Sequence, residues 1–351
     1  MNEKRRVLFD GYWLAEGPPS GRNVVEGLIA GWTSAFPRDE ILVAIPEKWP
    51  TLELPTGAIQ HPVRTRIRNH GLWCSLQIGR ESIGFDAVIT QNFTPMLGSG
   101  GARRATFLHD AIFKEHSEWF TPAERAYLAL ASAGLTKADA IITSSESERA
   151  RITHYFPRAA ARVHSVGLAV PVALANARGE HTRAVHAMRP FILTVGRLNI
   201  RKNLSRLIEA FEESGLKDSF DLLVVGEADG RAPALPQESG VTFTGKVSDE
   251  ELASFYRRCA FFVFPSLDEG FGLPLAEAAF FGAPSCASDI PAFREIGTAS
   301  AYFDPSDVGE ITSTLRAMAA VSAEAIATRN PTVAANSWHL TAARTRAAIF
   351  A

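Results

Sequence analysis

The sequence has few cysteines, no long apolar run and no excess of either charge. Its three cysteines, Cys74, Cys259 and Cys286, are widely spaced, which argues against a zinc centre or a disulfide framework and favours a reducing compartment. Apolar runs such as Cys259–Phe264 are far shorter than the roughly 18 residues that cross a bilayer. The 36 Lys and Arg nearly balance the 38 Asp and Glu, so we expect no nucleic-acid partner. Because the charged segment Met1–Arg6 lacks the apolar core of a signal peptide, we expect a cytoplasmic protein.

Short apolar segments rich in Val, Ile and Phe alternate with longer segments of helical character. The apolar residues of the short segments are continuous, which is typical of parallel strands buried on both faces. The predicted strands are Val7–Asp10, Ile41–Ile45, Ala87–Thr90, Ala105–Leu108, Ala140–Thr143, Phe191–Val195, Asp221–Val225, Val241–Thr244, Ala260–Phe264 and Pro284–Ala287. The predicted helices are Asn23–Phe36, Pro122–Leu135, Glu146–Tyr155, Leu204–Glu213, Asp249–Arg258, Pro274–Phe281 and an Ala-rich one near Met318–Ala327.

The chain of 351 residues is longer than a single hydrophobic core usually supports, so its length suits two domains. The strand and helix alternation predicts an α/β protein with two doubly wound, Rossmann-like parallel sheets. Leu168–Pro190 has little strand or helix signal, so we place domains at 1–170 and 191–330, a linker at 171–190 and a terminal segment at 331–351. Open α/β sheets bind ligands beyond the carboxyl ends of their strands, so we expect the site in a central cleft that both sets of strand ends face.

The most informative stretch runs from Phe264 to Ala278, where a predicted strand leads into a predicted helix. Gly270 and Gly272 allow a tight turn and a close approach of the backbone to a ligand. Pro274 suits the first helical position, where its missing N–H costs nothing. The N–H groups that begin this helix therefore form a predicted anion site.

Two carboxylates belong to the same stretch. Glu269 lies just before the turn, and Glu277 is predicted to lie in the first helical turn, so both can grip hydroxyl groups of a ligand. Each has a simpler interpretation: Glu277 would only complement the helix N-terminus, and Glu269 would be a solvated loop acid.

A second strand–turn–helix stretch runs from Val195 to Leu204. Gly196 forms the turn, and Asn203 is a predicted N-cap of the following helix. Arg197 and Lys202 add two cations beside a helix terminus, an arrangement that suits a diphosphate. A solvated basic loop is the alternative.

Together these stretches resemble the retaining GT-B glycosyltransferases of family 4. The resemblance covers most of the chain, because five motifs occur in the family's order. Gly196-Arg197 with Lys202-Asn203 is similar to the family's diphosphate-binding pair, and Glu269 and Glu277 have the spacing of its E-x7-E motif. The other three motifs are His109-Asp110 after a strand, the serine turn Ser144–Ser147, and Asn336-Ser337-Trp338 with Thr341 and Ala342, which resembles the family's terminal helix that crosses back onto the N-terminal domain.

The resemblance implies a role for each matching residue. Arg197 and Lys202 would neutralise the leaving diphosphate without a metal ion or other cofactor, and Glu277 would hold the donor ribose. His109, followed by Asp110, would hydrogen-bond the donor sugar. Glu269 would hold the same sugar together with the backbone of Gly270, Phe271, Gly272 and Leu273. The loops at Gly226 and Val247 occur where family members surround the nucleoside.

The implied activity is transfer of a hexose, with retention, from a nucleotide diphosphate sugar to a glycan or lipid-linked acceptor in polysaccharide or glycoconjugate synthesis. Asp268–Leu273 and His109-Asp110 are most similar to mannosyl- and rhamnosyl-transferring members, which favours a GDP-sugar. Two alternatives stay open. One is a sucrose- or trehalose-type synthase on the same fold, and the other is a non-catalytic nucleotide-sugar-binding subunit of a partner transferase.

Two N-terminal segments add separate expectations. The family's Gly-x-Gly-Arg loop is reduced to Gly21-Arg22 within Pro18–Asn23, so a donor contact through Gly21 is expected from a stiffer loop. Arg64, Arg66 and Arg68 alternate on one side of an extended segment. They form either a solvated face or a contact with an anionic acceptor or lipid, which would place the protein peripherally on the inner face of the membrane.

Overall fold

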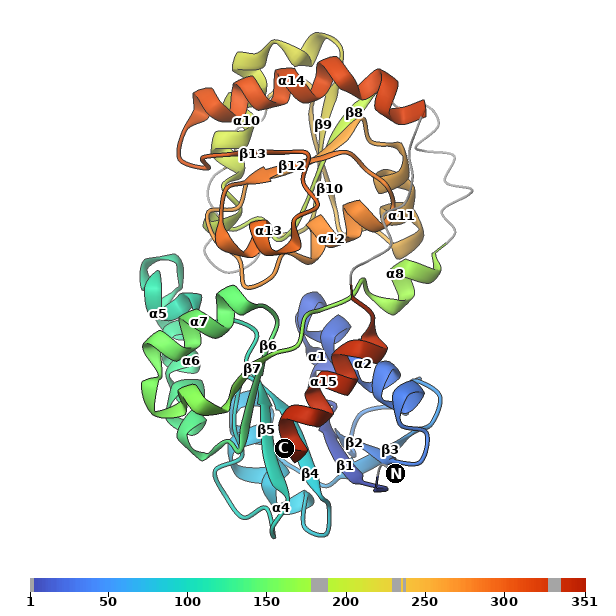
Figure 1. Cartoon of the computed structure of the whole chain (residues 1–351), viewed down its shortest axis with the longest axis vertical. Helices are drawn as coiled ribbons and strands as arrows, with labels where there is room; N and C mark the ends of the chain where they lie inside the picture. Colours follow the sequence, from blue (N-terminus) through green and yellow to red (C-terminus); the bar gives the residue numbers. More distant parts are fainter. Residues whose placement is uncertain (1–2, 178–188, 229–234, 236–237, 328–335) are drawn as a thin grey trace. The chain divides into compact units, whose positions relative to one another are not determined.

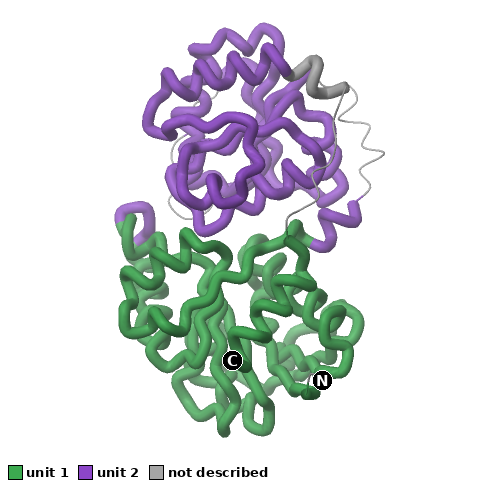
Figure 2. Tube along the Cα trace, in the orientation of Figure 1, with its two compact units in different colours: residues 1–117, 122–171, 336–351 green, residues 118–121, 172–335 purple. Residues whose placement is uncertain are grey.

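The structure is a computed structural model of the chain and describes residues 3–177, 189–228, 235, 238–327 and 336–351 (Figure 1). The chain divides into two compact units (Figure 2). Unit 1 contains residues 1–117, 122–171 and 336–351, and unit 2 contains residues 118–121 and 172–335.

Unit 1 is built on a seven-stranded sheet in the order β3-β2-β1-β4-β5-β6-β7, in which every pair is parallel. The order reverses between β1 and β4, as in doubly wound folds. The sequence predicted five of these strands and missed β3 and β7, because β3 is half exposed and β7 has three residues. The strands are β1 Arg6–Asp10, β2 Glu40–Pro46, β3 Ala58–Val63, β4 Ala87–Gln91, β5 Arg103–Phe107, β6 Ala140–Thr143 and β7 Val163–Ser165.

Helices cover both faces of this sheet, and the last helix of the chain belongs to unit 1. The helix α15 packs along α2 (Figure 1). The indole Nε1 of Trp338 donates to the carbonyl of Val170 at 2.8 Å, and Arg346 pairs with Asp39 at 2.9 Å. The helices are α1 Tyr12–Glu16, α2 Pro19–Ala35, α3 His70–Leu72, a π segment Trp73–Ile78, α4 Gly79–Glu81, α5 Ile112–Glu115, α6 Pro122–Gly134, α7 Glu146–Tyr155 and α15 Trp338–Phe350.

Unit 2 repeats the plan with a six-stranded parallel sheet in the order β10-β9-β8-β11-β12-β13. Its order reverses between β8 and β11, and α10 and α14 pack together over a core that includes Phe211 and Phe261. The strands are β8 Phe191–Val195, β9 Asp221–Val225, β10 Val241–Gly245, β11 Phe261–Phe264, β12 Ser285–Ser288 and β13 Ala301–Phe303. The helices are α8 Val172–Asn176, α10 Leu204–Ser214, α11 Asp249–Arg258, α12 Leu273–Phe280, α13 Pro291–Ile296 and α14 Val308–Ala327.

The structure corrects three predictions about elements. The predicted linker 171–190 contains the helix α8, which packs on α11, while 178–188 lies outside the described residues. The helix α2 begins at Pro19 rather than Asn23, because Pro19 itself suits the first helical position. The strand β13 was missed because it has only three residues. Among the described helices, none combines the length and apolar character needed to span a membrane.

Candidate active site

The predicted diphosphate and sugar residues meet in unit 2 at the carboxyl ends of β8 and β11. These two strands are hydrogen-bonded neighbours, and the order of the sheet reverses between them. The loop after β8 contains Gly196 to Asn203, and the loop after β11 contains Pro265 to Gly272. Ligands of open α/β sheets bind at such a reversal, so the two motifs share the position where a site is expected.

The backbone at Gly226, which follows β9, lies directly against the turn at Gly196. A Cβ atom at Gly226 would lie 1.9 Å from the carbonyl oxygen of Gly196, and φ at Gly226 is 143°. Only glycine fits both the space and this backbone conformation. The N–H of Gly196 donates to the carbonyl of Val225 at 2.9 Å, which fixes the turn. Gly226 therefore shapes the loop that carries Arg197.

Lys202 and Glu269 form a buried ion pair. The Nζ of Lys202 lies 2.5 Å from Oε1 of Glu269, and Arg201 lies 2.6 Å from the other carboxylate oxygen. The side chain of Arg201 also donates to the carbonyl of Asp268 at 3.2 Å, and the N–H of Leu267 donates to the carbonyl of Arg201 at 2.8 Å. The loop after β11 is thus fastened to the loop after β8.

Burial and charge act against each other at this pair. Burial by itself would raise the pKa of Glu269, but the charges of Arg201 and Lys202 lower the pKa to about 2. Burial lowers the pKa of Lys202 to about 8, with help from Arg201 and Arg197 and against the attraction of Glu269. Glu269 is therefore ionised at neutral pH and acts only as a hydrogen-bond acceptor. Lys202 is a cation whose proton is lost more easily than usual.

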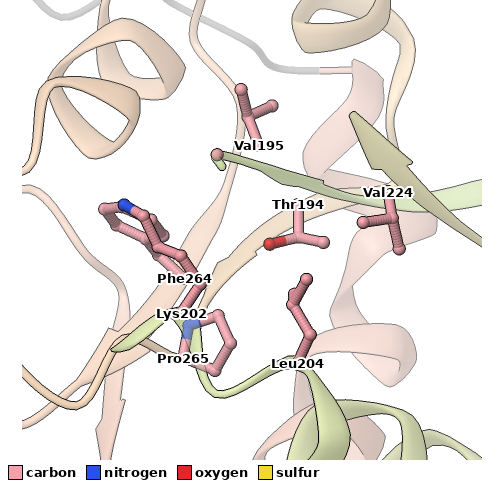
Figure 3. Close-up of a pocket in the computed structure, with 8 residues that line it drawn as sticks. Thr194, Val195, Lys202, Leu204, Val224, Phe264 and Pro265 are labelled. Atoms are coloured by element: carbon pink, nitrogen blue, oxygen red, sulfur yellow. The ribbon is translucent and has the colours of Figure 1, made fainter. Parts of the chain in front are cut away.

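A small cavity of about 10 Å³ lies beside Lys202, between the ends of β8, β9 and β11. Figure 3 shows its lining, which includes Thr194, Val224 and Pro265, with Lys202 extended past the ring of Phe264. The ammonium of Lys202 lies 4.5 Å from the centre of that ring. Because an aromatic face attracts a cation, this contact supports the charged form of Lys202 in its buried position.

Asn203 occupies the N-cap position of α10, as predicted, but its side chain does not cap the helix. It donates instead to the carbonyls of Pro265 at 3.1 Å and Pro305 at 2.7 Å. Its φ of 54° is left-handed, a conformation that asparagine tolerates better than most residues. Asn203 therefore ties the end of the diphosphate motif to the loop that carries Glu269.

The helix α12 begins after Gly272, and Pro274 is its second residue, one position later than the sequence predicts. Gly272 has φ 105°, and a Cβ atom there would lie 2.6 Å from the ring of Phe293. Gly270 is buried, whereas Phe271 and Leu273 are half-buried beside it. The N-terminus of α12 has no side-chain cap, and its backbone N–H groups favour an anion or a hydroxyl oxygen.

The position of Glu277 differs from the prediction. It is the fifth residue of α12, beyond the first turn, and it is buried. The hydroxyl of Tyr256 on α11 donates to its carboxylate at 2.8 Å. Burial raises the pKa of Glu277 to about 7, although the hydrogen bond from Tyr256 acts in the opposite direction. The two acids of the motif thus have opposite environments: Glu269 is held ionised, and Glu277 titrates near neutrality.

Three predicted residues belong to unit 1. The side chain of His109, just after β5, contacts Gln91 with 2.9 Å between its Nε2 and the amide oxygen Oε1. Asp110 follows His109 in the chain. Burial, and next the negative charge of Asp110, raise the pKa of Glu148 to about 8. Gly21 lies inside the first turn of α2, against the ring of Trp13, rather than in a loop. Its predicted role as a loop glycine is therefore wrong.

Two residues of the site were missed from the sequence. Arg201 precedes Lys202 in the same basic stretch, but its contact with Glu269 depends on a loop 68 residues further along the chain. Tyr256 had no signal, because its contact with Glu277 depends on the packing of α11 against the sheet. Val247 is half-buried in the connection between β10 and α11. Its assignment to the nucleoside stays a prediction.

Unit 1 also contains a buried group of side chains with metal-ligating chemistry. Asp10, at the end of β1, contacts His70 at 2.7 Å and Cys74 at 3.2 Å. The other oxygen of Asp10 accepts from the indole of Trp73 at 2.9 Å and from the N–H of Tyr12 at 3.1 Å. Burial raises the pKa of Cys74 well above its usual value. The thiol is therefore protonated, and hydrogen bonds satisfy the carboxylate without an ion.

The comparison with known proteins agrees with this geometry. The family model of glycosyl transferases group 1 matches residues 180–318. The serotype-specific mannosyltransferase WbdA of Escherichia coli is 32% identical over 193 residues, which are 50% of this chain and 24% of WbdA. A GDP-mannose-dependent alpha-mannosyltransferase of Mycolicibacterium smegmatis is 28% identical over 228 residues, 61% of this chain and 59% of that protein. The chain thus spans about a quarter of WbdA.

Solved structures define the class of fold. Sucrose-phosphate synthase from Thermosynechococcus elongatus superposes with a TM-score of 0.65 at 18% identity, covering 99% of this chain and 95% of that one. The two parallel sheets and this likeness give the chain the GT-B fold, as the sequence predicted. Residues 180–318 are thus similar to the family of glycosyl transferases group 1, and the mannosyltransferase relatives agree with this likeness.

Proposed function

We propose that this chain transfers a mannose-type hexose from a nucleotide diphosphate sugar, with a GDP-sugar favoured, to a glycan or lipid-linked acceptor. The transfer retains the anomeric configuration and uses no metal ion. The observation that carries the proposal is the buried contact of Lys202 and Arg201 with Glu269 at the sheet reversal of unit 2. The relatives named for mannosyl transfer, one of them GDP-mannose-dependent, support the choice of donor.

The diphosphate would bind between Arg197 and Lys202. Arg197 is close enough for its charge to lower the pKa of Lys202, and Arg201 adds a third cation. These three cations outnumber the single carboxylate, that of Glu269, with which Arg201 and Lys202 pair. Fixed positive charge of this kind stabilises a leaving diphosphate as the sugar–phosphate bond breaks. It supplies the neutralisation that a metal ion gives in other transferases.

Glu269 would orient the sugar rather than attack it. Both of its oxygens are held by cations, at 2.5 Å and 2.6 Å, which makes the carboxylate a poor nucleophile. Its remaining lone pairs accept hydrogen bonds from sugar hydroxyls. A front-face reaction follows, in which the departing phosphate deprotonates the acceptor. Glu277 would accept the ribose hydroxyls, and the backbone at Gly226 and Val247 would border the nucleoside.

We propose that His109, oriented by its contact with Gln91, hydrogen-bonds the donor sugar. A lipid-linked acceptor in bacterial surface glycan synthesis would place the protein at the cytoplasmic face of a membrane, as a peripheral protein.

The first experiment is a thermal-shift panel of GDP-, UDP-, dTDP- and ADP-sugars. A ligand that binds only the folded state raises its stability by mass action, so the donor nucleotide should stand out. Donor hydrolysis is then measured in EDTA. Turnover in EDTA supports the proposal, whereas loss on chelation that manganese or magnesium restores contradicts metal independence. Binding without any hydrolysis or transfer would favour the non-catalytic binding subunit.

A further inference from the structure

The serine turn Ser144–Ser147 has no task in the proposed function. In the structure it leads from β6 into α7. Ser145 is the N-cap of α7, and its side-chain oxygen accepts from the N–H of Glu148 at 3.0 Å. The cap fixes the first turn of the helix and, with it, the position of Glu148.

The loop that carries His109 lies next to this turn. The strands β5 and β6 are parallel neighbours, and the N–H of Leu108 donates to the carbonyl of Ile142 at 2.8 Å. The carboxyl ends of two paired parallel strands meet at the same edge of the sheet, so the segments that follow them are neighbours. Residues 109–111 form the segment that leads from β5 toward α5.

Side chains hold both ends of residues 109–111. At the near end, Oδ1 of Asn92, just after β4, accepts from the N–H of His109 at 3.1 Å. At the far end, Oε1 of Glu148 accepts from the N–H of Ala111 at 2.6 Å. The side chain of Glu148 is fully buried. The helix α7 therefore fixes the loop from beneath the surface of unit 1.

Arg151 strengthens this attachment from the next turn of α7. It lies 2.5 Å from Oε2 of Glu148 and 2.8 Å from the carboxylate of Glu115, the last residue of α5. Figure 1 shows α5 and α7 side by side. The start of α5 is tied to α7 through Ala111, and its end is tied to α7 through Glu115.

The burial of Glu148 places its carboxyl group near the negative charge of Asp110. Burial and this charge raise its pKa, whereas Arg151 and the N–H of Ala111 act in the opposite direction. A protonated carboxyl group and an ionised one both keep an oxygen that can accept from Ala111. The bond to the loop therefore persists in either state, and a glutamine can reproduce it.

We propose that Glu148 is a positioning residue, which holds the loop of His109 and Asp110 so that the His109 ring faces the donor sugar. The ring centre lies 4.9 Å from that of Phe107 and 5.1 Å from that of Trp13, so a shift of the loop would change its surroundings. Misplacement of a reacting or orienting group by about 1 Å can slow a reaction about 100-fold. The proposal rests on the role of His109 proposed above, but the position of the ring can be measured without a donor.

The test compares Glu148→Leu, which removes the acceptor and keeps most of the volume, with Glu148→Gln, which keeps the acceptor. Hydrolysis of GDP-mannose measures kcat, and calorimetric titration with GDP measures nucleotide affinity. In Glu148→Leu, kcat should fall about 10- to 100-fold. The affinity for GDP should stay native, because the proposed diphosphate residues belong to unit 2. Glu148→Gln should restore most of the rate.

NMR of the full chain labelled with ¹⁵N-histidine reports on the ring itself. The variant His109→Gln assigns its signal among the nine histidines. Without donor, the His109 signals should shift in Glu148→Leu and stay native in Glu148→Gln. If the leucine variant fails to fold, Glu148→Ala removes the same acceptor without placing a large apolar group beside Arg151.

Asp39 provides a matched control in the same unit. It is a buried carboxylate that pairs with Arg346 at 2.9 Å and accepts from the N–H of Arg5 at 2.9 Å. Asp39→Leu therefore removes the same kinds of contact far from His109 in the sequence. It should lower the melting temperature but leave kcat and the His109 signals native.

The two measurements separate this proposal from the proposed function. Native His109 signals in Glu148→Leu would overturn the proposal at any rate of turnover. So would a Glu148→Gln variant as impaired as Glu148→Leu, or an equal loss of kcat in Asp39→Leu. Shifted signals with a native kcat would confirm that Glu148 positions His109 and would contradict the role of His109 in transfer. If the native chain does not hydrolyse GDP-mannose, the proposed donor fails, and the NMR comparison still decides the position of the loop.

Discussion

The ammonium of Lys202 lies 2.5 Å from the carboxylate of Glu269, and these two residues come from loops that follow different strands of the unit 2 sheet. The contact joins the two motifs that the sequence suggested for diphosphate and sugar. Arg201 holds the second oxygen of the same carboxylate. In the proposed function, Lys202 would exchange part of its attraction to Glu269 for attraction to the diphosphate.

Lys202→Ala should lower kcat strongly. Negative charge on the leaving oxygen grows as the sugar–phosphate bond breaks, so the loss should be about 100-fold or more, as for removal of one preorganised charge stabiliser. Affinity for the nucleoside diphosphate should fall only modestly. Steady-state kinetics and calorimetric titration measure the two effects. Lys217→Ala, which removes another lysine paired with a glutamate, is the control. A native rate in Lys202→Ala would show that the donor lies elsewhere.

The rate should also depend on the proton of Lys202. Because its pKa is lowered to about 8, kcat/KM, which reports the free enzyme, should decline as the pH rises through about 8. Lys202→Arg should move this decline out of the accessible range, since guanidinium keeps its charge. A pH profile of both proteins tests the assignment. An unchanged alkaline limb in Lys202→Arg would assign it to another group.

Glu269→Gln should impair transfer while leaving affinity for the free nucleoside diphosphate nearly intact, since Glu269 is assigned to the sugar. The variant leaves two buried cations without their partner, which should cost roughly 3 kcal/mol of stability. The folded pKa of Glu269, about 2, is below the usual 4.5, so its stabilisation is present above pH 4.5 and lost as the pH falls toward 2. Urea unfolding at several pH values measures this loss, which Glu269→Gln should abolish. Glu212→Gln, in the exposed pair with Lys217, should change neither property.

Tyr256→Phe should alter the titration of Glu277. The folded pKa of Glu277 is raised to about 7, so its contribution to stability is full below pH 4.5 and lost as the pH rises through 7. Removing the Tyr256 hydroxyl takes away the larger of the two effects that lower this pKa, the other being the charge of Lys202, so the pKa should rise further. The KM for the donor should then fall only at a higher pH than in the native chain, because the ionised carboxylate accepts hydrogen bonds from the ribose better than the protonated one does. Tyr302→Phe, which loses a 3.3 Å bond to a carbonyl, is the control. Identical pH profiles for Tyr256→Phe and the native chain would contradict this role.

Gly226→Ala should be more damaging than Gly245→Ala. Both glycines have positive φ, so each variant carries a backbone cost of roughly 1–3 kcal/mol. Only at Gly226 does the new Cβ meet another atom, the Gly196 carbonyl at 1.9 Å, whereas the space at Gly245 is open. Gly226→Ala should therefore lose roughly 1–3 kcal/mol more, together with donor binding. Thermal unfolding and nucleotide titration compare the two variants. Equal losses of stability in the two variants would contradict the close contact between Gly226 and the carbonyl of Gly196.

Several features could be predicted from local sequence because they depend on local chemistry. The buried strands β6 and β8 are continuous apolar runs and were predicted with their exact bounds. Glycine and proline at Gly272 and Pro274 marked the start of α12. The half-exposed edge strand β3 was missed because its burial pattern is decided by its neighbours. Gly21 was misplaced because Pro19 starts α2 earlier than the apolar pattern alone indicates.

The sequence by itself determined the α/β class, the order of the two strand series and the positions of the two strand–turn–helix stretches. These follow from periodicity, from turn residues and from spacing along one chain. The tertiary structure alone decided that Arg201 shares Glu269 with Lys202 and that Tyr256 holds Glu277. These contacts join side chains 67, 68 and 21 residues apart. They exist only because parallel strands bring their carboxyl ends together and helices pack beside them, and no local pattern encodes that proximity.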